Sequence, residues 1–349
     1  MKEGYRLLGD FIQPVDERNR DLKVDYLLGV SISKQFIPSI ANIVGTDLSS
    51  YKIVRTGQFA YGPVTSRNGE KISIALLRDK DCIISSSYTV FEVVNKNALD
   101  PEYLMLWFSR PEFDRYARYM SHGSVREIFD WDELCKVELP VPSIDKQRSI
   151  VKAYNTITDR IELKRKINDN LEAVLAASHS KMFFSKDTSE HSKLGELMTF
   201  GNGKSRPKTD GPIPVYGGNG VLSYTDHHNI ENAVLIGRVG AYCGSVYLEQ
   251  GICWVSDNAI FAKSKITKDE FFDYFLLKRL NLFNHHVGTG QQLLTQEILN
   301  NIEVPKPVTE QIELFNRKAT SIFETIFTNS REIIRLQELS DLLLSRLAG

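Results

Sequence analysis

Two Pro-x-Pro segments, each followed by a long stretch of mixed polar and apolar residues, constrain this chain more than any other sequence feature. The first reads "VELPVPSIDKQRSIV" and the second "IEVPKPVTEQIELF". Proline lacks a backbone N–H and biases the residue before it away from helix, so neither helix begins before Pro142 or Pro307. We therefore expect two helices that start near Ser143 and Thr309, whose hydroxyls are suitable N-caps.

The segment after each Pro-x-Pro has the 3,4 spacing of apolar residues that is typical of a coiled-coil seam. The pattern is weaker in the middle of the first copy but keeps its phase. Each helix would run for about 35 to 40 residues, or roughly 55 to 60 Å. Because such an apolar stripe needs a partner, we expect the two helices to pack antiparallel on each other and to separate two globular heads, as in a dumbbell. The predicted seam consists of Ile150, Ile157, Ile161, Leu171, Leu175, Phe315, Ile322, Ile326, Ile333, Leu336 and Leu343.

The repeat extends upstream of the helices, so one unit is used twice. "HGSVREIFDWDELCKVELPVP" lies over "VGTGQQLLTQEILNNIEVPKP" without a gap and pairs Gly123 with Gly288. "PEYLMLWFSR" resembles "DEFFDYFLLKR" as an aromatic helix, and "LLGDFI" resembles "KLGELM". The middle of each repeated unit consists of short apolar runs separated by glycine, which is typical of strands joined by tight turns. We predict an α+β fold with a pseudo-twofold internal repeat and segments 1–142, 143–185, 186–307 and 308–349, the first and third being β-rich heads.

Composition narrows the class of protein. With 349 residues, 42% hydrophobic and 25% charged, the chain is typical of a globular protein of more than one domain. Its four cysteines, without an N-terminal apolar signal segment, indicate reduced thiols, and no apolar run approaches the roughly 20 residues that span a bilayer. We therefore expect a cytoplasmic protein with no membrane contact. The formal charge of −1 gives no global sign of an anionic partner.

A search for catalytic and cofactor motifs points to a binding module rather than an enzyme. "GNGKS" resembles the end of a phosphate-binding loop, but Met198 stands where that loop requires glycine. The pairs His227/His228 and His285/His286 have no cysteine or acid at metal-ligand spacing. Nothing resembles a serine elbow or a zinc protease motif. We expect no cofactor and no metal on this chain.

Two heads on a fixed spacer suit a long ligand that carries two short sites, and duplex DNA is such a ligand. "GNGKSRPKT" is basic without an acid, and the first half carries the cationic cluster Arg110, Arg115, Arg118 and Arg126. Cations of this kind suit phosphate contacts, while Asn, Gln and Arg on turns suit base reading. Solvated surface charges are the alternative, and these residues alone leave both readings open.

Several segments of the chain resemble those of a known protein family. "ELPVPSIDKQRSIVKAYNTITDRIE" resembles the start of the conserved helix in specificity subunits of type I restriction-modification systems. "GPIPVYGGNGVLSYTD", "VLIGRVGAYCGSVY" and "WVSDNAIFA" resemble one of that family's target-recognition domains. The acid-Gln pair of the family reads Lys146-Gln147 in the first copy and Glu310-Gln311 in the second. Aligning these glutamines shifts the helix register between the copies by one residue.

The resemblance implies a non-catalytic subunit that binds double-stranded DNA at an asymmetric bipartite site, one half for each head. It implies two modification (methyltransferase) subunits docked on the helices, and restriction (endonuclease and translocase) subunits. The methyl donor, ATP and Mg²⁺ would belong to those partners. Alternatives are a specificity subunit of another restriction-type system and a two-headed coiled-coil scaffold that binds carbohydrate or peptide.

Candidate DNA-contacting residues follow from the turns, the local chemistry and the repeat position. For "SDNA" the alternative is a turn in which Asp257 and Asn258 satisfy backbone groups. In the second head the candidates are Lys204, Arg206, Gly218, Asn219, Arg238, Tyr242, Asp257 and Asn258. In the first head they are Tyr61, Ser66, Arg67, Asn68, Tyr88, Ser124 and Arg126.

Overall fold

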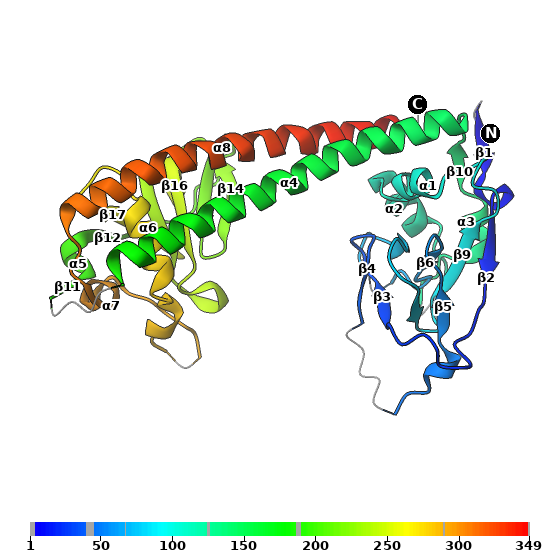
Figure 1. Ribbon diagram of the computed structural model, residues 1–349, viewed down its shortest axis with the longest axis horizontal. Coiled ribbons are helices and arrows are strands. Elements are labelled where there is room, and N and C mark those ends of the chain that lie inside the picture. Colours follow the sequence, from blue (N-terminus) through cyan, green and yellow to red (C-terminus); the bar gives the residue numbers. More distant parts are fainter. Residues whose placement is uncertain are drawn as a thin grey trace. The chain divides into compact units, whose positions relative to one another are not determined.

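The computed structural model describes residues 4–39, 45–66, 68–123, 126–185, 190–288 and 290–347. The chain divides into two compact units. Unit 1 is Met1–Leu163 with Ile333–Gly349, and unit 2 is Lys164–Glu332. The expected segment boundaries fall one residue before the starts of the two long helices, α4 (Ile144–Phe183) and α8 (Thr309–Arg346). The compact units, however, divide each helix near its middle. Figure 1 shows α4 in green and α8 in orange to red.

Unit 1 is built on a four-stranded antiparallel sheet in the order β2-β9-β6-β7, with the pairs β1-β10, β3-β4 and β5-β8 around it. Its helices α1 to α3 follow β9 in the chain. The elements are β1 (Tyr5–Leu7), β2 (Ile12–Val15), β3 (Leu28–Val30), β4 (Phe36–Pro38), β5 (Lys52–Val54), β6 (Phe59–Tyr61), β7 (Ile74–Leu76), β8 (Cys82–Ile84), β9 (Thr89–Val93), α1 (Pro101–Phe108), α2 (Pro111–Tyr119), α3 (Trp131–Cys135) and β10 (Glu138–Pro140).

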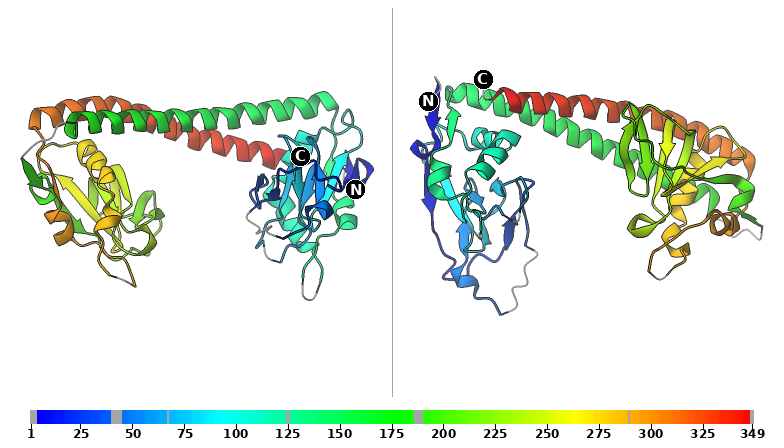
Figure 2. Two further views of the ribbon diagram at one scale, coloured as in Figure 1. Left: turned by 60° about the horizontal axis from the view of Figure 1, so that its bottom comes forward. Right: turned by 180° about the vertical axis from the view of Figure 1, so that it is seen from behind.

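Unit 2 is built on a six-stranded sheet in the order β12-β17-β15-β16-β13-β14, in which only β13 and β16 run parallel. Helix α6 lies between this sheet and the long helices, and two further views show the same layering (Figure 2). The elements are β11 (His191–Lys193), α5 (Leu194–Leu197), β12 (Met198–Asn202), β13 (Ile213–Gly217), β14 (Gly220–Thr225), β15 (Ile230–Gly237), β16 (Val246–Val255), β17 (Ala259–Ser264), α6 (Phe271–Arg279), α7 (Gln296–Asn301) and β18 (Glu303–Pro305).

The central strands of both sheets bury both of their faces. Along β15, Val234 and Ile236 join the core that faces the long helices, while Leu235 joins a second cluster on the other side. Strand β6 does the same in unit 1, where Phe59 and Ala60 enter different clusters. Successive side chains of a strand point to opposite faces of the sheet. A strand that is covered on both faces therefore carries apolar residues at consecutive positions.

Within each unit the two long helices pack antiparallel, as the seam pattern predicts. In unit 2 the rings of Phe183 and Phe315 lie 6.1 Å apart, at the end of α4 and the beginning of α8. In unit 1, Ile150 near the start of α4 shares a core with Leu344 near the end of α8. Every predicted seam residue is buried or half-buried, and Phe323 and Leu344 add to the seam.

The polar interruptions of the seam meet in one buried cluster in unit 2. Lys164 donates to Asn329 Oδ1 at 2.9 Å and forms an ion pair with Glu332 at 2.7 Å. Asn329 donates in turn to Asn168 Oδ1 at 2.9 Å. From Lys164 to Asn168 along α4, the contacts on α8 move back from Glu332 to Ile326, as antiparallel packing requires. A buried polar group needs a particular partner, and the cluster therefore holds the two helices in one register.

The helix starts resolve the register between the two copies. Gln147 N donates to Ser143 O at 3.0 Å, and Ile312 N donates to Val308 O at 3.1 Å. Ser143 and Val308 are therefore equivalent, no gap separates the copies at this point, and the two glutamines of the acid-Gln pairs are not equivalent. Ser143 precedes α4 as expected. Thr309, expected as an N-cap, is instead the first helical residue, and Val308 precedes the helix.

A fully buried amide ties each long helix to its head. Gln147 accepts from Asp100 N at 2.8 Å and donates to Ala98 O and Pro142 O at 2.9 and 2.8 Å. In unit 2, Asn316 accepts from Phe272 N at 2.9 Å and donates to both Thr267 Oγ1 and Asp269 O. Each amide therefore fixes the loop that leads into the aromatic helix, α1 in one unit and α6 in the other.

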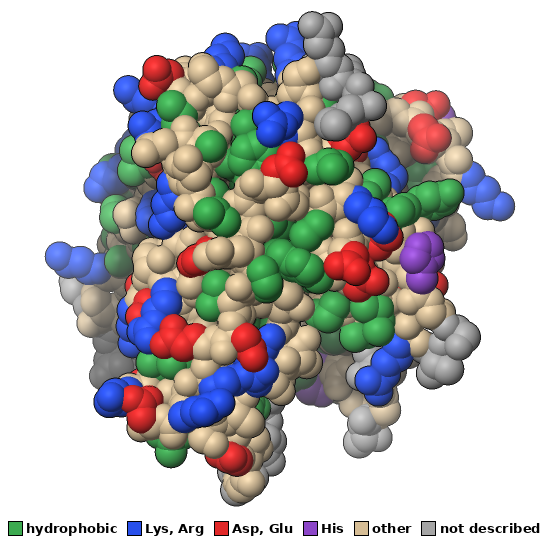
Figure 3. Space-filling view, turned by 90° about the vertical axis from the view of Figure 1, so that its right-hand side faces the viewer, with side chains coloured by type: hydrophobic (Ala, Val, Ile, Leu, Met, Phe, Trp, Pro, Cys, Tyr) green, Lys and Arg blue, Asp and Glu red, His purple; other side chains and the backbone are tan. Residues whose placement is uncertain are grey.

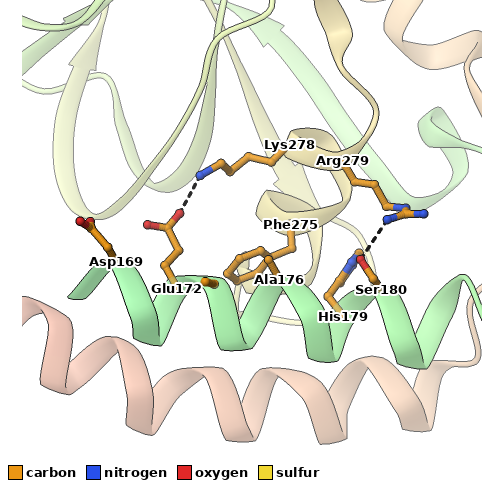
Figure 4. Close-up of a pocket in the computed structure, with 9 residues that line it drawn as sticks. Asp169, Glu172, Ala176, His179, Ser180, Phe275, Lys278 and Arg279 are labelled. Carbon is orange, nitrogen blue, oxygen red and sulfur yellow. Dashed lines mark hydrogen bonds and ion pairs between the residues drawn. The ribbon is translucent and has the colours of Figure 1, made fainter. Parts of the chain in front are cut away.

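A hollow of about 540 Å³ lies between α4 and α6 in unit 2 (Figure 4). Its rim is charge-compensated, because Glu172 pairs with Lys278 at 2.7 Å and Arg279 donates to Ser180 at 2.9 Å. His179, which is 1% exposed, lies on its inner wall among phenylalanine rings. Burial, and to a lesser extent the charge of Arg279, lowers the pKa of His179 to about 3.

The cysteines and the ionisable groups of the described residues include the side chains that a metal centre would require. All four cysteines are free thiols, as expected. Among the residues that the structure describes, no group of three or more His, Cys, Asp or Glu lies close enough together to hold a metal ion. No helix in this described part is both long and apolar enough to cross a membrane.

Replacing Gln147 with alanine tests the clamp between α4 and its head. The variant leaves Asp100 N and two carbonyls unpaired, so we expect the free energy of unfolding to fall by about 2 to 4 kcal/mol. Urea denaturation followed by circular dichroism measures the change. Asn155→Ala, on an exposed position of the same helix, is the control and should stay within roughly 0.5 kcal/mol of wild type. Equal midpoints for the two variants would contradict the clamp.

The pKa of His179 predicts how acid destabilises unit 2. The unfolded chain takes up a proton near pH 6.5, whereas the folded unit resists protonation until about pH 3. Stability contributed by neutral His179 is therefore complete above pH 6.5 and decreases as pH falls, by about 2 kcal/mol between pH 7 and pH 5. His179→Phe should remove this part of the decrease. Denaturation midpoints of both proteins at the two pH values measure it, and parallel decreases would refute the assignment.

Candidate nucleic-acid interface

In unit 2, three turns converge on Gly218. The first is the hairpin turn between β13 and β14, which consists of Gly218 and Asn219. A Cβ added to Gly218 would lie 3.7 Å from Asn258 O and 3.7 Å from the Cβ of Tyr242. Ser245 Oγ donates to the carbonyl of Gly218. The turn between β15 and β16 and the turn between β16 and β17 therefore pack directly against the hairpin.

The turn after β15 positions Arg238 and Tyr242. Arg238 N donates to Asn258 O at 3.0 Å, which joins this turn to the one that precedes β17. A Cβ at Gly237 would lie 2.1 Å from Tyr242 O, so only glycine permits this close approach. Tyr242 is 51% exposed. Arg238 is half-buried, and its Nε has no hydrogen-bond partner among the described residues.

The remaining candidates of the second head lie beside these turns. Lys204 N donates to Val255 O at 3.0 Å, which holds the start of an exposed segment against the end of β16. Arg206 follows in the same exposed segment. The side chains of Asp257 and Asn258 are both exposed. The structure thus brings Gly218, Asn219, Arg238, Tyr242, Asp257, Asn258 and Lys204 to one region of unit 2, and Arg206 lies two residues beyond it in the chain.

The sequence search missed a fourth segment of this region, the loop between residues 287 and 293. Val287 and Leu293 exchange both backbone hydrogen bonds at 2.9 Å, which closes the loop. Gly240 N donates to Gln292 O at 3.0 Å, and Leu294 N donates to Arg238 O at 2.9 Å. Gln291 is exposed at the end of this loop. Its only sequence signal is its place opposite Arg126 in the gapless alignment of the two copies.

Unit 1 contains the same loop. His122 and Ile128 exchange both backbone hydrogen bonds, at 3.1 and 2.9 Å. Thr65 N donates to Glu127 O at 2.9 Å, as Gly240 N does to Gln292 O in unit 2. Arg126 is exposed, as Gln291 is. The loop and its anchor are thus common to both heads, although the side chains differ.

The other candidates of the first head have different surroundings. Ser66 is exposed, and Asn68 is half-buried with its side chain donating to Val64 O at 3.4 Å. Tyr88 is also half-buried, and its hydroxyl accepts from Val30 N at 3.5 Å. Two further candidates, Arg67 and Ser124, lie outside the described residues.

Two expectations for unit 1 need correction. Tyr61 is fully buried, with its ring against Phe91 and Phe129, so it belongs to the core and offers no surface for DNA. Arg110 is 5% exposed and its guanidinium stacks on Trp107 at 4.2 Å, which makes it a packing residue rather than a phosphate contact. Both residues carry polar groups at positions where the covered sheet or an aromatic helix buries them.

Charge is mixed on the surface that surrounds the first head. Arg115 pairs with Glu112 at 3.1 Å, and Arg118 pairs with Glu127. Figure 3 shows basic and acidic side chains interspersed over the face that it displays, in keeping with the formal charge of −1. The described part of this face thus presents no broad field of one sign, and contacts to an anionic ligand would be local.

Comparison with known proteins identifies a family. A family model described as the type I restriction modification DNA specificity domain matches residues 39–173 and again residues 186–342. The chain is 21% identical over 305 residues to the type I restriction enzyme MjaIX specificity subunit of Methanocaldococcus jannaschii, across 73% of this chain and 70% of that protein. It is 25% identical over 154 residues to the HindI specificity subunit of Haemophilus influenzae, across 42% and 32% of the two chains.

A solved structure shows the same fold. The crystal structure of the S subunit of a type I restriction-modification system from M. genitalium matches with a TM-score of 0.65 at 16% identity, over 99% of this chain and 96% of that one. At this identity the likeness concerns the fold. The family model, by contrast, covers most of the chain and matches each half once. The chain therefore belongs to the family of type I restriction-modification DNA specificity domains, as the resemblance in its sequence indicated.

Proposed function

We propose that this chain binds an asymmetric, bipartite DNA sequence and that each unit reads one half of it. The observation that carries the proposal is the frame shared by the two units, in which the same anchored loop presents Arg126 in one and Gln291 in the other. A common frame with different exposed side chains is what two readers of different half-sites require. Membership of the DNA specificity family supports the same conclusion.

The candidate residues divide by chemistry into two roles. Lys204 and Arg206, exposed in the segment between β12 and β13, suit contacts to phosphate, which fix position without reading sequence. Arg238 and Asn258 lie on packed turns and suit base edges, because base reading needs a side chain held in place. The free Nε of Arg238 supports this role, since a buried donor gains most from a new acceptor.

The long helices are proposed as the docking surface for two modification (methyltransferase) subunits, which would in turn carry restriction subunits. Exposed apolar side chains on α4 support this, since Leu163 is 59% and Val174 60% exposed. On α8, Ile334 is 60% exposed. The methyl donor, ATP and Mg²⁺ would bind to those partners, so this chain would supply sequence recognition and no catalytic group. Cationic side chains of those partners would also supply phosphate contacts, in addition to the few that this near-neutral chain can make.

Two alanine variants separate the proposed roles of arginine. Arg238→Ala should relax the base preference at one position of one half-site, at a cost of about 1 to 3 kcal/mol for the cognate sequence. Arg206→Ala should weaken binding to all sequences alike and lower the salt dependence by about one charge. Fluorescence anisotropy with cognate and single-substituted duplexes at several salt concentrations measures both effects.

Arg317→Ala, exposed on α8, serves as the control for the arginine variants and should leave binding and preference unchanged. If Arg206→Ala and Arg238→Ala behave like this control, the assigned site is wrong.

Co-purification with the modification subunit tests the function as a whole. The chain should form a stable complex with that subunit, and the complex should methylate adenines within a sequence of two short specific parts separated by unspecified bases. Sequencing of methylated adenines in a host genome supplies the measurement. A continuous recognition sequence, or a complex without methylation, would count against the proposal.

A further inference from the structure

The two heads share more than an approximate fold at the loop that carries Arg126 and Gln291. In unit 1, Phe129 N donates to Pro63 O at 2.8 Å, and in unit 2, Leu294 N donates to Arg238 O at 2.9 Å. Isolated bridges join Val64 to Ile128 and Val239 to Leu293 in the same way. In each unit, two backbone hydrogen bonds close the loop and two more tie its last residues to the segment that follows β6 in unit 1 or β15 in unit 2.

A glycine makes this loop tight in both units. Gly123 has a φ of +138° and Gly288 a φ of +92°, values that L side chains rarely adopt. A Cβ at Gly123 would lie 2.2 Å from Arg126 O, and one at Gly288 would lie 2.4 Å from Gln291 O. The carbonyls of Arg126 and Gln291 therefore pack against the glycine, and each side chain leaves the loop at an equivalent position.

Both side chains are exposed and available for a ligand. Neither Arg126 nor Gln291 has a side-chain hydrogen bond or ion pair within the described ranges, and both are exposed. The residue that follows is held in each case, because Thr65 N and Gly240 N donate to the carbonyls of Glu127 and Gln292. The fixed backbone determines where each side chain starts, and the hydrogen-bonding groups of both side chains remain open to a base.

The chemistry of the two side chains differs in a way that DNA distinguishes. The guanidinium of arginine donates two parallel hydrogen bonds that match O6 and N7 of guanine in the major groove. The amide of glutamine both accepts and donates, which matches N6 and N7 of adenine. The same loop position thus carries a guanine-type reader in unit 1 and an adenine-type reader in unit 2.

We propose that this loop is a base-reading element common to both heads, with Arg126 selecting guanine in one half-site and Gln291 selecting adenine in the other. The inference rests on the proposed function, because it assumes that each unit reads DNA. It goes further in assigning one residue in each head to one base. Because the loop has the same backbone anchors in both units, exchanging the two side chains should exchange the two base preferences.

Reciprocal substitution tests the proposal in the complete complex with the modification subunit. Arg126→Gln should change one position of one half-site from guanine to adenine, and Gln291→Arg should change one position of the other half-site from adenine to guanine. The original base should lose about 5- to 150-fold in preference, as expected for one bidentate contact. Arg126→Ala should accept any base at that position. Methylated-adenine sequencing on a library with both half-sites randomised measures all of these variants.

The controls are the same exchanges at exposed positions of unit 1 outside the candidate site and the long helices, Arg20→Gln and Gln35→Arg, which should leave the recognised sequence unchanged. Loop variants that methylate the wild-type sequence with unchanged preference would overturn the assignment. So would a uniform loss across all sequences, which would indicate a phosphate or structural role. If the wild-type complex recognises no bipartite sequence at all, the proposed function itself fails, whereas altered specificity at other positions only would refute this inference alone.

Discussion

Burial of one apolar stripe along each long helix is the constraint on which the rest of this structure depends. The stripes of α4 and α8 cover each other in antiparallel register, and the polar residues that interrupt them meet as Lys164, Asn168 and Asn329. Apolar contacts alone tolerate sliding, whereas a buried amine and two amides accept only one set of partners. The same helices extend into both compact units, so each head folds onto a half of each helix.

Buried polar contacts join each head to the pair of long helices. Gln147 and Asn316 each make two hydrogen bonds to the loop that leads into an aromatic helix, and a third to Pro142 and Phe272 respectively. The aromatic helix then packs against the sheet, and the sheet carries the turns. A continuous series of packed elements therefore links the helix seam to the exposed turns. The exposed side chains on the turns can be replaced without disturbing these contacts. This separation of a constant frame from variable surface residues is what a specificity subunit needs.

Much of this arrangement was predictable from the sequence, because the seam and the repeat depend on spacing alone. Apolar residues at 3,4 intervals require a partner helix, and the gapless alignment of the two copies pairs Gly123 with Gly288. Other features depend on three-dimensional packing. Tyr61 was expected to contact DNA because of its position in the repeat, but β6 is covered on both faces, so all three of its residues are buried. Arg110 is buried because Trp107 offers a ring for its guanidinium. Gln291 carried no motif and became visible only through its backbone anchor.

If the two heads are interchangeable readers on one frame, a chain with two copies of the first head is their most direct test. In such a chain, residues 4–142 would replace residues 190–307, and the helices would remain. The complex of this chain with the modification subunit should methylate a sequence whose two specific parts are the same half-site. Methylation of the wild-type sequence, or of two different half-sites, would contradict this expectation.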